Sequence, residues 1–225
     1  MKMKKIMGII LILTGIVVIC IPIGWQLYVK YEQNKMIEDI KEQIQDNKNN
    51  PSATQTDINE VDGASEYDQI ELDTEDTSET AEDETDEKVD SSLKNQNVIG
   101  LIEIDALDIC FPVVEGTARA NIRVAIGHIK GTAAMGEVGN CVLAGHRGGI
   151  YGEFFKNIHK LEEGDSVKVT NSNGDEYIYN VYEKFVVKPT DMSVIKTIGS
   201  ESTLTLISCE NSGKQRLIIR CKLEQ

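Results

Sequence analysis

A cysteine and an arginine lie close together near the carboxyl end of the chain. Cys209 ends the apolar run 203–208, and Arg216 opens a second apolar run, 217–219. The Asn-Ser-Gly sequence at 211–213 is typical of a turn, so the runs predict an antiparallel hairpin that brings Cys209 and Arg216 together. A guanidinium favours the thiolate form of a nearby cysteine and can bind the oxyanion of a tetrahedral intermediate. We therefore expect Cys209 to be a nucleophile and Arg216 to stabilise the oxyanion.

A histidine ends a third apolar run. Residues 140–145 (Asn-Cys-Val-Leu-Ala-Gly) predict a buried strand that delivers His146 to its end. A thiolate that attacks a backbone carbonyl needs a donor to protonate the departing amine, and imidazole has a suitable pKa, so His146 is the expected general acid. A single cysteine at a strand end is more often a small core residue. It is the joint occurrence of Cys209, His146 and Arg216 that favours catalysis.

Two further arginines compete for the oxyanion role. Arg220 lies four residues after Arg216 and thus on the same face of the predicted strand, but further from the end that meets Cys209. Arg147 directly follows His146, where we expect it to anchor its loop. Arg216 is therefore the preferred candidate.

The other histidines are expected to be structural. His128 lies in a glycine-flanked loop, and His159 lies in a predicted solvated helix. Three histidines in these positions do not have the spacing of a metal-ligand cluster. The loop 188–203 contains only Asp191 and Glu201, too few carboxylates for a calcium site. We expect no metal and no cofactor.

The acidity of the chain belongs to one segment. The formal net charge is −14, but residues 37–97 carry 20 acidic and 4 basic side chains, whereas residues 98–225 carry 16 and 14. Residues 46–97 contain only scattered aliphatic side chains, so they cannot bury enough surface to offset the entropy of ordering, and we expect a disordered tether. The residues after position 97 suffice for one domain with a core. No part is basic enough for nucleic-acid binding.

The amino-terminal segment predicts a membrane anchor. Three lysines within residues 1–5 precede the almost wholly apolar residues 6–29, which are long enough to cross about 30 Å of hydrocarbon as a helix. A cleaved signal peptide is the main alternative, but its apolar region is usually shorter and ends at a small-residue cleavage site. We expect a single-pass protein of the cell membrane with a cytoplasmic amino terminus and an extracellular domain. A short helix, residues 31–45, is expected to follow the anchor.

Four cysteines lie outside the predicted anchor, and an even number in an extracellular protein suggests disulfides. Three of them, however, sit within apolar strand patterns as small core residues would: Cys110, Cys141 and Cys221. We therefore expect free thiols, with Cys209 as the only functional one.

Many short strands and few short helices predict a single β-rich domain, a closed or partly closed barrel. The expected strands are 98–104, 109–114, 140–145, 165–170, 176–188, 203–209 and 216–220, and the expected short helices are 118–126 and 154–161. The chain thus divides into a cytoplasmic tip and anchor (1–30), a juxtamembrane helix with an acidic linker (31–97) and a folded domain (98–225).

Three motifs resemble those of the sortase family of cysteine transpeptidases. They are Leu-Ala-Gly-His at 143–146, Thr-Leu-Ile-Ser-Cys at 205–209, and Arg216 a short loop later. The resemblance spans about residues 98–223, although Ser208 stands where many sortases have threonine. It implies an all-β-dominated fold, a closed eight-stranded barrel with short helices, in a membrane-anchored enzyme of a Gram-positive bacterium.

By this resemblance, the protein would cleave surface proteins at a sorting signal of the Leu-Pro-x-Thr-Gly kind and form a thioacyl intermediate on Cys209. The acyl group would pass to an amine of a cell-wall peptide or of a pilin. His146 and Arg216 would be the general acid and the oxyanion donor. The resemblance leaves the class open between C-like and D-like sortases.

Two alternatives stay open. A hydrolytic cysteine peptidase would use the same residues with water as the acceptor. A non-catalytic surface-binding module would use Cys209 as a core residue and would leave its thiol inert to alkylation.

Overall fold

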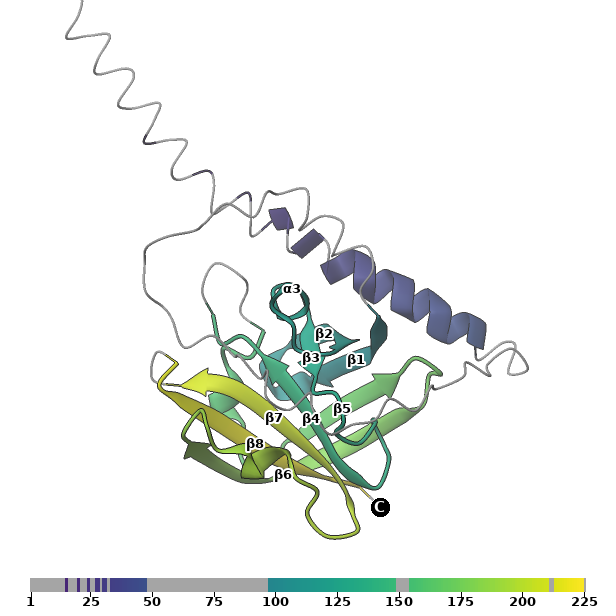
Figure 1. The fold of residues 1–225 in the computed structure, drawn as a ribbon. Coiled ribbons are helices and arrows are strands. Elements are labelled where there is room, and N and C mark those ends of the chain that lie inside the picture. Colours follow the sequence, from purple (N-terminus) through teal and green to yellow (C-terminus); the bar gives the residue numbers. More distant parts are fainter. Residues whose placement is uncertain are drawn as a thin grey trace, which may run out of the picture.

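The computed structural model describes residues 15, 20, 24, 27, 28, 30, 31, 33–47, 97–148, 154–210 and 213–224. Within these residues, eight strands close into a barrel in the order β1-β2-β3-β4-β7-β8-β6-β5 (Figure 1). The strands are β1 (Val98–Ile104), β2 (Ile109–Glu115), β3 (Ile126–His128), β4 (Gly139–Gly145), β5 (Ser166–Asn171), β6 (Glu176–Val187), β7 (Ser202–Glu210) and β8 (Gln215–Leu223). The predicted closed eight-stranded barrel is confirmed.

The strands β4, β7 and β8 bury both of their faces. In β7, Leu204 and Leu206 belong to the core inside the barrel, whereas Ile207 belongs to a second apolar cluster on the outer face. We call this second set of buried residues the outer cluster: Ile129, Val142, Ala144, Val194, Ile207 and Ile218. Val194 comes from the 3-10 segment η4 (Met192–Ile195), which therefore packs on the outside of these strands.

Two predicted helices are wrong in extent or type. Residues 118–126 contain one helical turn, α3 (Arg119–Ile122), and Ile126 then begins β3, which pairs in parallel with β2. Residues 154–161 form turns and the 3-10 segment η3 (Ile158–Lys160) rather than an α-helix. A third 3-10 segment, η2 (Asp105–Leu107), joins β1 to β2. Strand pairing with β2 overrides the weak helical pattern at residues 124–126.

The predicted hairpin between β5 and β6 is confirmed. The two strands pair in antiparallel register from Ser166 opposite Asn180 to Thr170 opposite Glu176. Gly174 in the connecting turn has φ +86°, a left-handed conformation that glycine adopts without steric cost.

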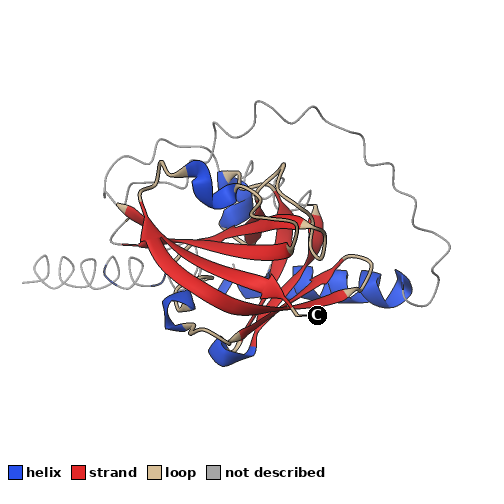
Figure 2. Cartoon of the chain, turned by 90° about the horizontal axis from the view of Figure 1, so that it is seen from below, coloured by secondary structure: helices blue, strands red, loops and turns tan. Residues whose placement is uncertain are grey.

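Residues 33–47 form a helix that lies against the outside of the barrel beside β1 (Figures 1 and 2). Ile40 and Ile44 are buried against Leu101 of β1. At the end of the helix, Asn47 Nδ2 donates a hydrogen bond of 2.9 Å to the carbonyl oxygen of Ser172. The helix expected at residues 31–45 is thus present, and it packs on the barrel.

Most of the predicted membrane-spanning segment, residues 6–29, lies outside the described residues. Residues 48–96 of the predicted tether lie wholly outside them. In the part of the chain that the structure describes, no helix has the length and the apolar character to cross a membrane. The division of the chain at positions 30 and 97 stays a prediction.

Replacing Ile40 by alanine is expected to lower the free energy of unfolding by about 2 to 5 kcal/mol, because a buried isoleucine is lost from the contact between helix and barrel. Ile40 is only 1% exposed. Chemical denaturation of the full chain measures the effect, with Glu42→Ala at an exposed position of the same helix as the control. Equal stability of the two variants would show that the helix does not stabilise the barrel.

Candidate active site

Two parallel strands carry His146 and Cys209 to the same end of the barrel. β4 pairs in parallel with β7, and the register opposes Gly145 to Ser208, the residues directly before His146 and Cys209. Both positions therefore lie where neighbouring strands end at one edge of the sheet.

The strand β8 brings Arg216 to the same place. β7 and β8 pair in antiparallel register with Cys209 directly opposite Arg216, which confirms the predicted hairpin. Residues opposed in an antiparallel ladder have Cα atoms about 4.5 to 5.5 Å apart. The three positions selected from the sequence thus lie together where β4 and β7 end and β8 begins.

The strand alternation assigns two of the three positions to the outer face of the barrel. On each strand, a residue of the outer cluster lies two positions away from the functional position: Ala144, Ile207 and Ile218. Because positions two apart in a strand share a face, positions 209 and 216 lie on the outer face, and His146 directly follows the last residue of β4. The candidate site therefore borders the outer cluster, not the barrel interior.

Close packing fixes the end of β4. The backbone N–H of Phe155 donates a hydrogen bond of 2.8 Å to the carbonyl oxygen of His146, and the Phe155 side chain is fully buried. A Cβ at Gly145 would lie 2.6 Å from Ile126 Cδ1 and 2.8 Å from Phe155 Cδ2, so only glycine fits there. Ser208 Oγ donates to the Phe155 carbonyl oxygen at 3.4 Å. His146 itself is half-buried.

Arg216 is buried and held by its own hairpin. Its Nη1 donates hydrogen bonds to the carbonyl oxygens of Gly213 and Gln215, at 2.9 and 3.2 Å. Only 5% of Arg216 is exposed. Gly213 adopts φ +80°, a left-handed conformation that glycine adopts without steric cost. A guanidinium fixed in this way is a preorganised donor.

The competing arginines have different surroundings. Arg220 lies opposite Thr205, four positions along β8 from Arg216. Its Nη1 donates to Glu183 Oε2 at 3.1 Å, and its guanidinium lies 4.9 Å from the centre of the Phe185 ring. Arg147 follows His146 and is half-buried.

The two other histidines lie elsewhere. His159, in η3, is exposed, and its Nδ1 donates to the carbonyl oxygen of Lys156 at 3.0 Å. His128, at the end of β3, is 5% exposed and takes part in a polar network of its own.

The described cysteines other than Cys209 are free thiols, so the disulfide alternative is wrong for them. Cys141 and Cys221 are buried in the barrel core, and burial raises the pKa of Cys221 to about 12. Cys110 is half-buried, and burial, with a smaller contribution from the Glu103 carboxylate, raises its pKa. Neither Cys110 nor Cys221 has the lowered pKa of a reactive cysteine.

The two carboxylates considered for calcium serve other contacts. Asp191 accepts hydrogen bonds from Ser193, at 3.0 Å from the backbone N–H and 2.6 Å from the hydroxyl, and these bonds lower the pKa of Asp191. Glu201 pairs with Lys222 at 2.7 Å. Among the described residues, no group of three or more histidine, cysteine or acidic side chains is arranged to hold a metal ion.

Sequence reasoning missed Asn140, whose side chain joins η4 and Lys196 to β7. Its Nδ2 donates to the carbonyl oxygens of Val194 and Lys196, at 3.0 and 3.2 Å, and its Oδ1 accepts from Thr205 Oγ1 at 2.7 Å. A polar residue at the start of an apolar run is the signal in the sequence, and it does not reveal the partners of Asn140. The role of Phe155 was also missed.

The comparisons with known proteins agree on one family. A family model described as "Sortase domain" matches residues 102–224, which is more than half of the chain. The chain is 31% identical over 110 residues to Sortase D of Bacillus subtilis, which covers 49% of the chain and 53% of that protein. It is 30% identical over 144 residues to Sortase A of Bacillus anthracis, which covers 64% and 67%. The chain thus spans only about half of the Bacillus subtilis relative.

Solved structures give the same result. A Clostridium perfringens Sortase D5 transpeptidase is 35% identical, with a TM-score of 0.54, and the match covers 63% of this chain and 89% of that one. Sortase C1 of Streptococcus agalactiae is 28% identical, with a TM-score of 0.54, and the match covers 57% and 68%.

Proposed function

The chain belongs to the sortase family, and we propose that it is a cysteine transpeptidase with Cys209 as its nucleophile. The observation that supports this most strongly is the strand register, which makes positions 146, 209 and 216 neighbours at one end of β4, β7 and β8. A thiol, an imidazole and a guanidinium are the groups that acyl transfer through a thioacyl intermediate requires.

In the first half of the reaction, the Cys209 thiolate attacks the carbonyl carbon of the scissile peptide bond. The carbonyl oxygen takes up negative charge, and the Arg216 guanidinium stabilises it. The His146 imidazolium gives its proton to the nitrogen of the departing amine, the carbon–nitrogen bond breaks, and a thioacyl bond to Cys209 remains.

In the second half, the nitrogen of an incoming amine attacks the thioacyl carbon. Neutral His146 takes the proton that this nitrogen loses, Arg216 again stabilises the oxyanion, and the carbon–sulfur bond breaks to release the Cys209 thiolate. The new peptide bond joins the acyl group to the amine, and the starting protonation states are restored.

The proposed substrates are surface proteins with a sorting signal of the Leu-Pro-x-Thr-Gly kind, and the acceptor is an amine of the cell wall or of a pilin. An apolar surface next to the site supports this choice. The half-buried side chains of Val187 and Ile195 pack on the outer cluster, where aliphatic residues of the signal would find apolar contact. Incubation with sorting-signal peptides of varied sequence and with both kinds of amine tests the substrate and the acceptor.

We place the protein in the cell membrane, with residues 6–29 as a single anchor and the barrel outside the cell. The support is the apolar run and the lysines that precede it. Fractionation of cells, followed by protease treatment of intact cells, tests this topology. Recovery in the soluble fraction, or protection of the barrel in intact cells, would contradict it.

Replacing Arg216 by lysine is expected to lower kcat by about 10² to 10³-fold, because lysine cannot reproduce the fixed planar donor aimed at the oxyanion. Arg220→Lys is the matched control on the same strand and should leave kcat nearly unchanged, since Arg220 pairs with Glu183. Steady-state kinetics with a sorting-signal peptide measures both. If the loss followed Arg220 instead, the assignment of the oxyanion donor would be wrong.

A further inference from the structure

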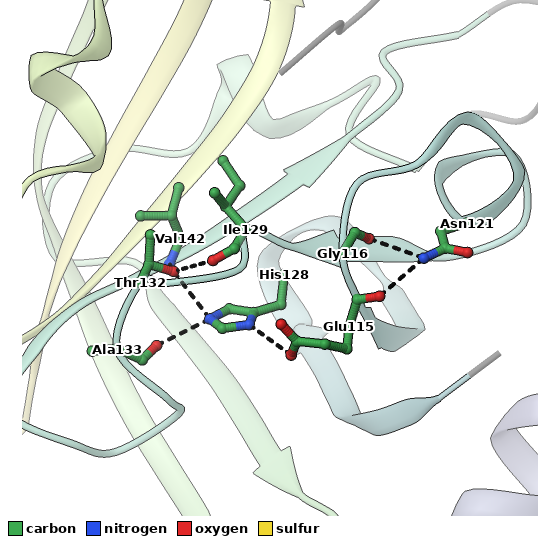
Figure 3. A network of polar contacts seen from close by, with 8 residues as sticks. All are labelled: Glu115, Gly116, Asn121, His128, Ile129, Thr132, Ala133 and Val142. Atoms are coloured by element: carbon green, nitrogen blue, oxygen red, sulfur yellow. Dashed lines mark hydrogen bonds and ion pairs between the residues drawn. The ribbon is translucent and has the colours of Figure 1, made fainter. Parts of the chain in front are cut away.

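The polar network around His128 has no part in the chemistry proposed above. His128 ends β3, between β2 and β4, and its ring lies among Glu115, Thr132 and Ala133 (Figure 3). The His128 side chain is 7% exposed and that of Glu115 is 30% exposed. Solvent therefore contributes little to the hydrogen bonding of this imidazole.

One ring nitrogen of His128 faces a carboxylate. Nδ1 lies 2.9 Å from Oε2 of Glu115, the β2 residue paired with His128 in the parallel ladder. An ionised carboxylate can only accept a hydrogen bond. Nδ1 therefore carries a proton.

The other ring nitrogen also faces acceptors. Nε2 lies 3.0 Å from the carbonyl oxygen of Ala133, which can only accept, and 3.0 Å from Thr132 Oγ1. The Thr132 hydroxyl already donates its proton to the carbonyl oxygen of Ile129 at 2.7 Å, so it too accepts from His128. Nε2 therefore also carries a proton, and His128 is an imidazolium.

The electrostatics of the site agree with the hydrogen bonds. Burial by itself lowers the pKa of His128, but interactions with the Cys141 thiol and the Glu115 carboxylate outweigh it and raise the pKa from 6.5 to about 10. These two side chains, on β4 and β2, are the titratable groups that act on His128. The charged Lys130 of the same loop has its side chain packed beside Gly116.

The network reaches the strand that carries His146. The N–H of Val142 in β4 donates to Thr132 Oγ1 at 3.3 Å, and its carbonyl oxygen accepts from Ile129 N at 2.9 Å. Ala133 N donates to the carbonyl oxygen of Asn140 at 3.1 Å. The loop that encloses His128 is therefore bonded to β4 four to six residues before His146.

The network also extends to the opposite side of His128. Asn121 Nδ2 donates to the carbonyl oxygens of Glu115 and Gly116, at 2.9 and 3.2 Å, and so holds the end of β2 (Figure 3). These bonds hold the backbone of Glu115, whose side chain pairs with His128.

We propose that His128 is held as a buried imidazolium whose ion pair with Glu115 fixes β4 against β2 and β3, so that His128 is a positioning residue for His146. The protonation state follows from the contacts of His128 alone. The positioning role rests on the acyl-transfer function proposed above. Strands β2, β3 and β4 thereby help to align the general acid, His146.

The ion pair has a defined dependence on pH. Because the pKa of His128 is raised in the folded state, the pair stabilises the fold fully below about pH 6.5, and the stabilisation is lost as the pH rises toward about 10. The barrel is therefore expected to lose stability on the alkaline side, where a neutral ring would turn a bare nitrogen toward either the Glu115 carboxylate or the Ala133 carbonyl oxygen.

The protonation state is tested by nitrogen NMR of the full chain in detergent micelles with labelled histidine. At about pH 8.5, a group with a pKa near 10 is still largely protonated, whereas an ordinary histidine is neutral. We expect both ring nitrogens of His128 to carry protons at this pH. Glu115→Gln should lower the titration midpoint of His128, whereas Glu137→Gln, an exposed change in the β3–β4 loop, should not. A neutral His128 at this pH in the unaltered protein would overturn the proposal.

The positioning role is tested by the pH profile of kcat and KM for the same variants. Glu115→Gln should lower kcat at least about tenfold with little change in KM, and the loss should grow toward alkaline pH, because misplacement of a catalytic group affects the chemical step. Thr132→Ser keeps the hydroxyl and should retain both kcat and the raised titration midpoint of His128. Thr132→Val removes the hydroxyl and should lower both kcat and the midpoint.

A shifted His128 titration with unchanged kcat would overturn the positioning role. Inactivity of the unaltered protein toward every peptide would count against the proposed function instead, and the NMR titration would still decide the protonation state. If Glu115→Gln failed to fold, the titration of the unaltered protein and the Thr132 pair would decide the proposal.

Discussion

Replacing Cys209 by alanine is expected to abolish both the thioacyl adduct and the joined product, with a loss of at least about 10⁴-fold in kcat/KM. None of the other three cysteines of the barrel can take its place. Cys141 and Cys221 are buried in the core, and Cys110 lies on β2, with its pKa raised by burial.

The matched control for this substitution is Cys110→Ala, which removes a half-buried thiol from a different part of the barrel and should leave kcat/KM nearly unchanged. Alkylation should inactivate the unaltered protein and the Cys110→Ala variant alike. If Cys209→Ala still transferred the acyl group, or if Cys110→Ala were inactive while Cys209→Ala stayed active, Cys209 would not be the nucleophile.

Replacing His146 by alanine is expected to lower kcat by about 10² to 10⁴-fold, the range for loss of a general acid. A comparison of two substrates shows whether the loss of kcat comes from the loss of proton donation. A thioester substrate expels a thiolate, which leaves without being protonated, so its cleavage should suffer much less than that of the peptide.

His159→Ala is the control for this second prediction, because the His159 side chain is exposed and its ring donates to the Lys156 carbonyl oxygen. The bond from Lys184 Nζ to the His159 carbonyl oxygen involves the backbone, which alanine keeps. It should behave like the unaltered protein with both substrates. An equal loss for thioester and peptide in His146→Ala would argue against proton donation to the leaving amine and for a role of His146 in holding the site together.

The neighbouring positions of the candidate site could be predicted from the sequence because each lies at one end of an apolar run. The run at 140–145 stops at a glycine, and the run at 203–208 stops at Cys209, so the ends of two strands were visible before their pairing was known. The Asn-Ser-Gly turn then predicted the β7–β8 hairpin. The parallel pairing of β4 with β7 came only from the structure, because their 63-residue separation leaves no local signal.

Features that depend on distant partners could not be predicted. The isoleucines at 37, 40 and 44 predicted a helix, but nothing in them specifies β1 as the surface on which it packs. The three-residue strand β3 was too short to be distinguished from the end of a helix. The glycines near His128 predicted a loop residue. The sequence could not show its hydrogen-bond acceptors, because they lie on β2 and in the loop after β3.

The packing of residues 33–47 also determines how the protein should be studied. A fragment that starts near residue 90 would leave Leu101 and its apolar neighbours on the barrel without the helix that covers them. Experiments on the full chain avoid this exposure and keep the segment that joins the barrel to the proposed anchor.

Mass spectrometry of the full chain after incubation with sorting-signal peptides and an amine acceptor tests the central claim most directly. We expect an acyl adduct on the peptide that contains Cys209 and a product in which acyl group and amine are joined, with neither in Cys209→Ala. Cleavage without joining for every amine offered would identify a hydrolase. The absence of any adduct, together with a Cys209 that resists alkylation, would contradict the catalytic account altogether.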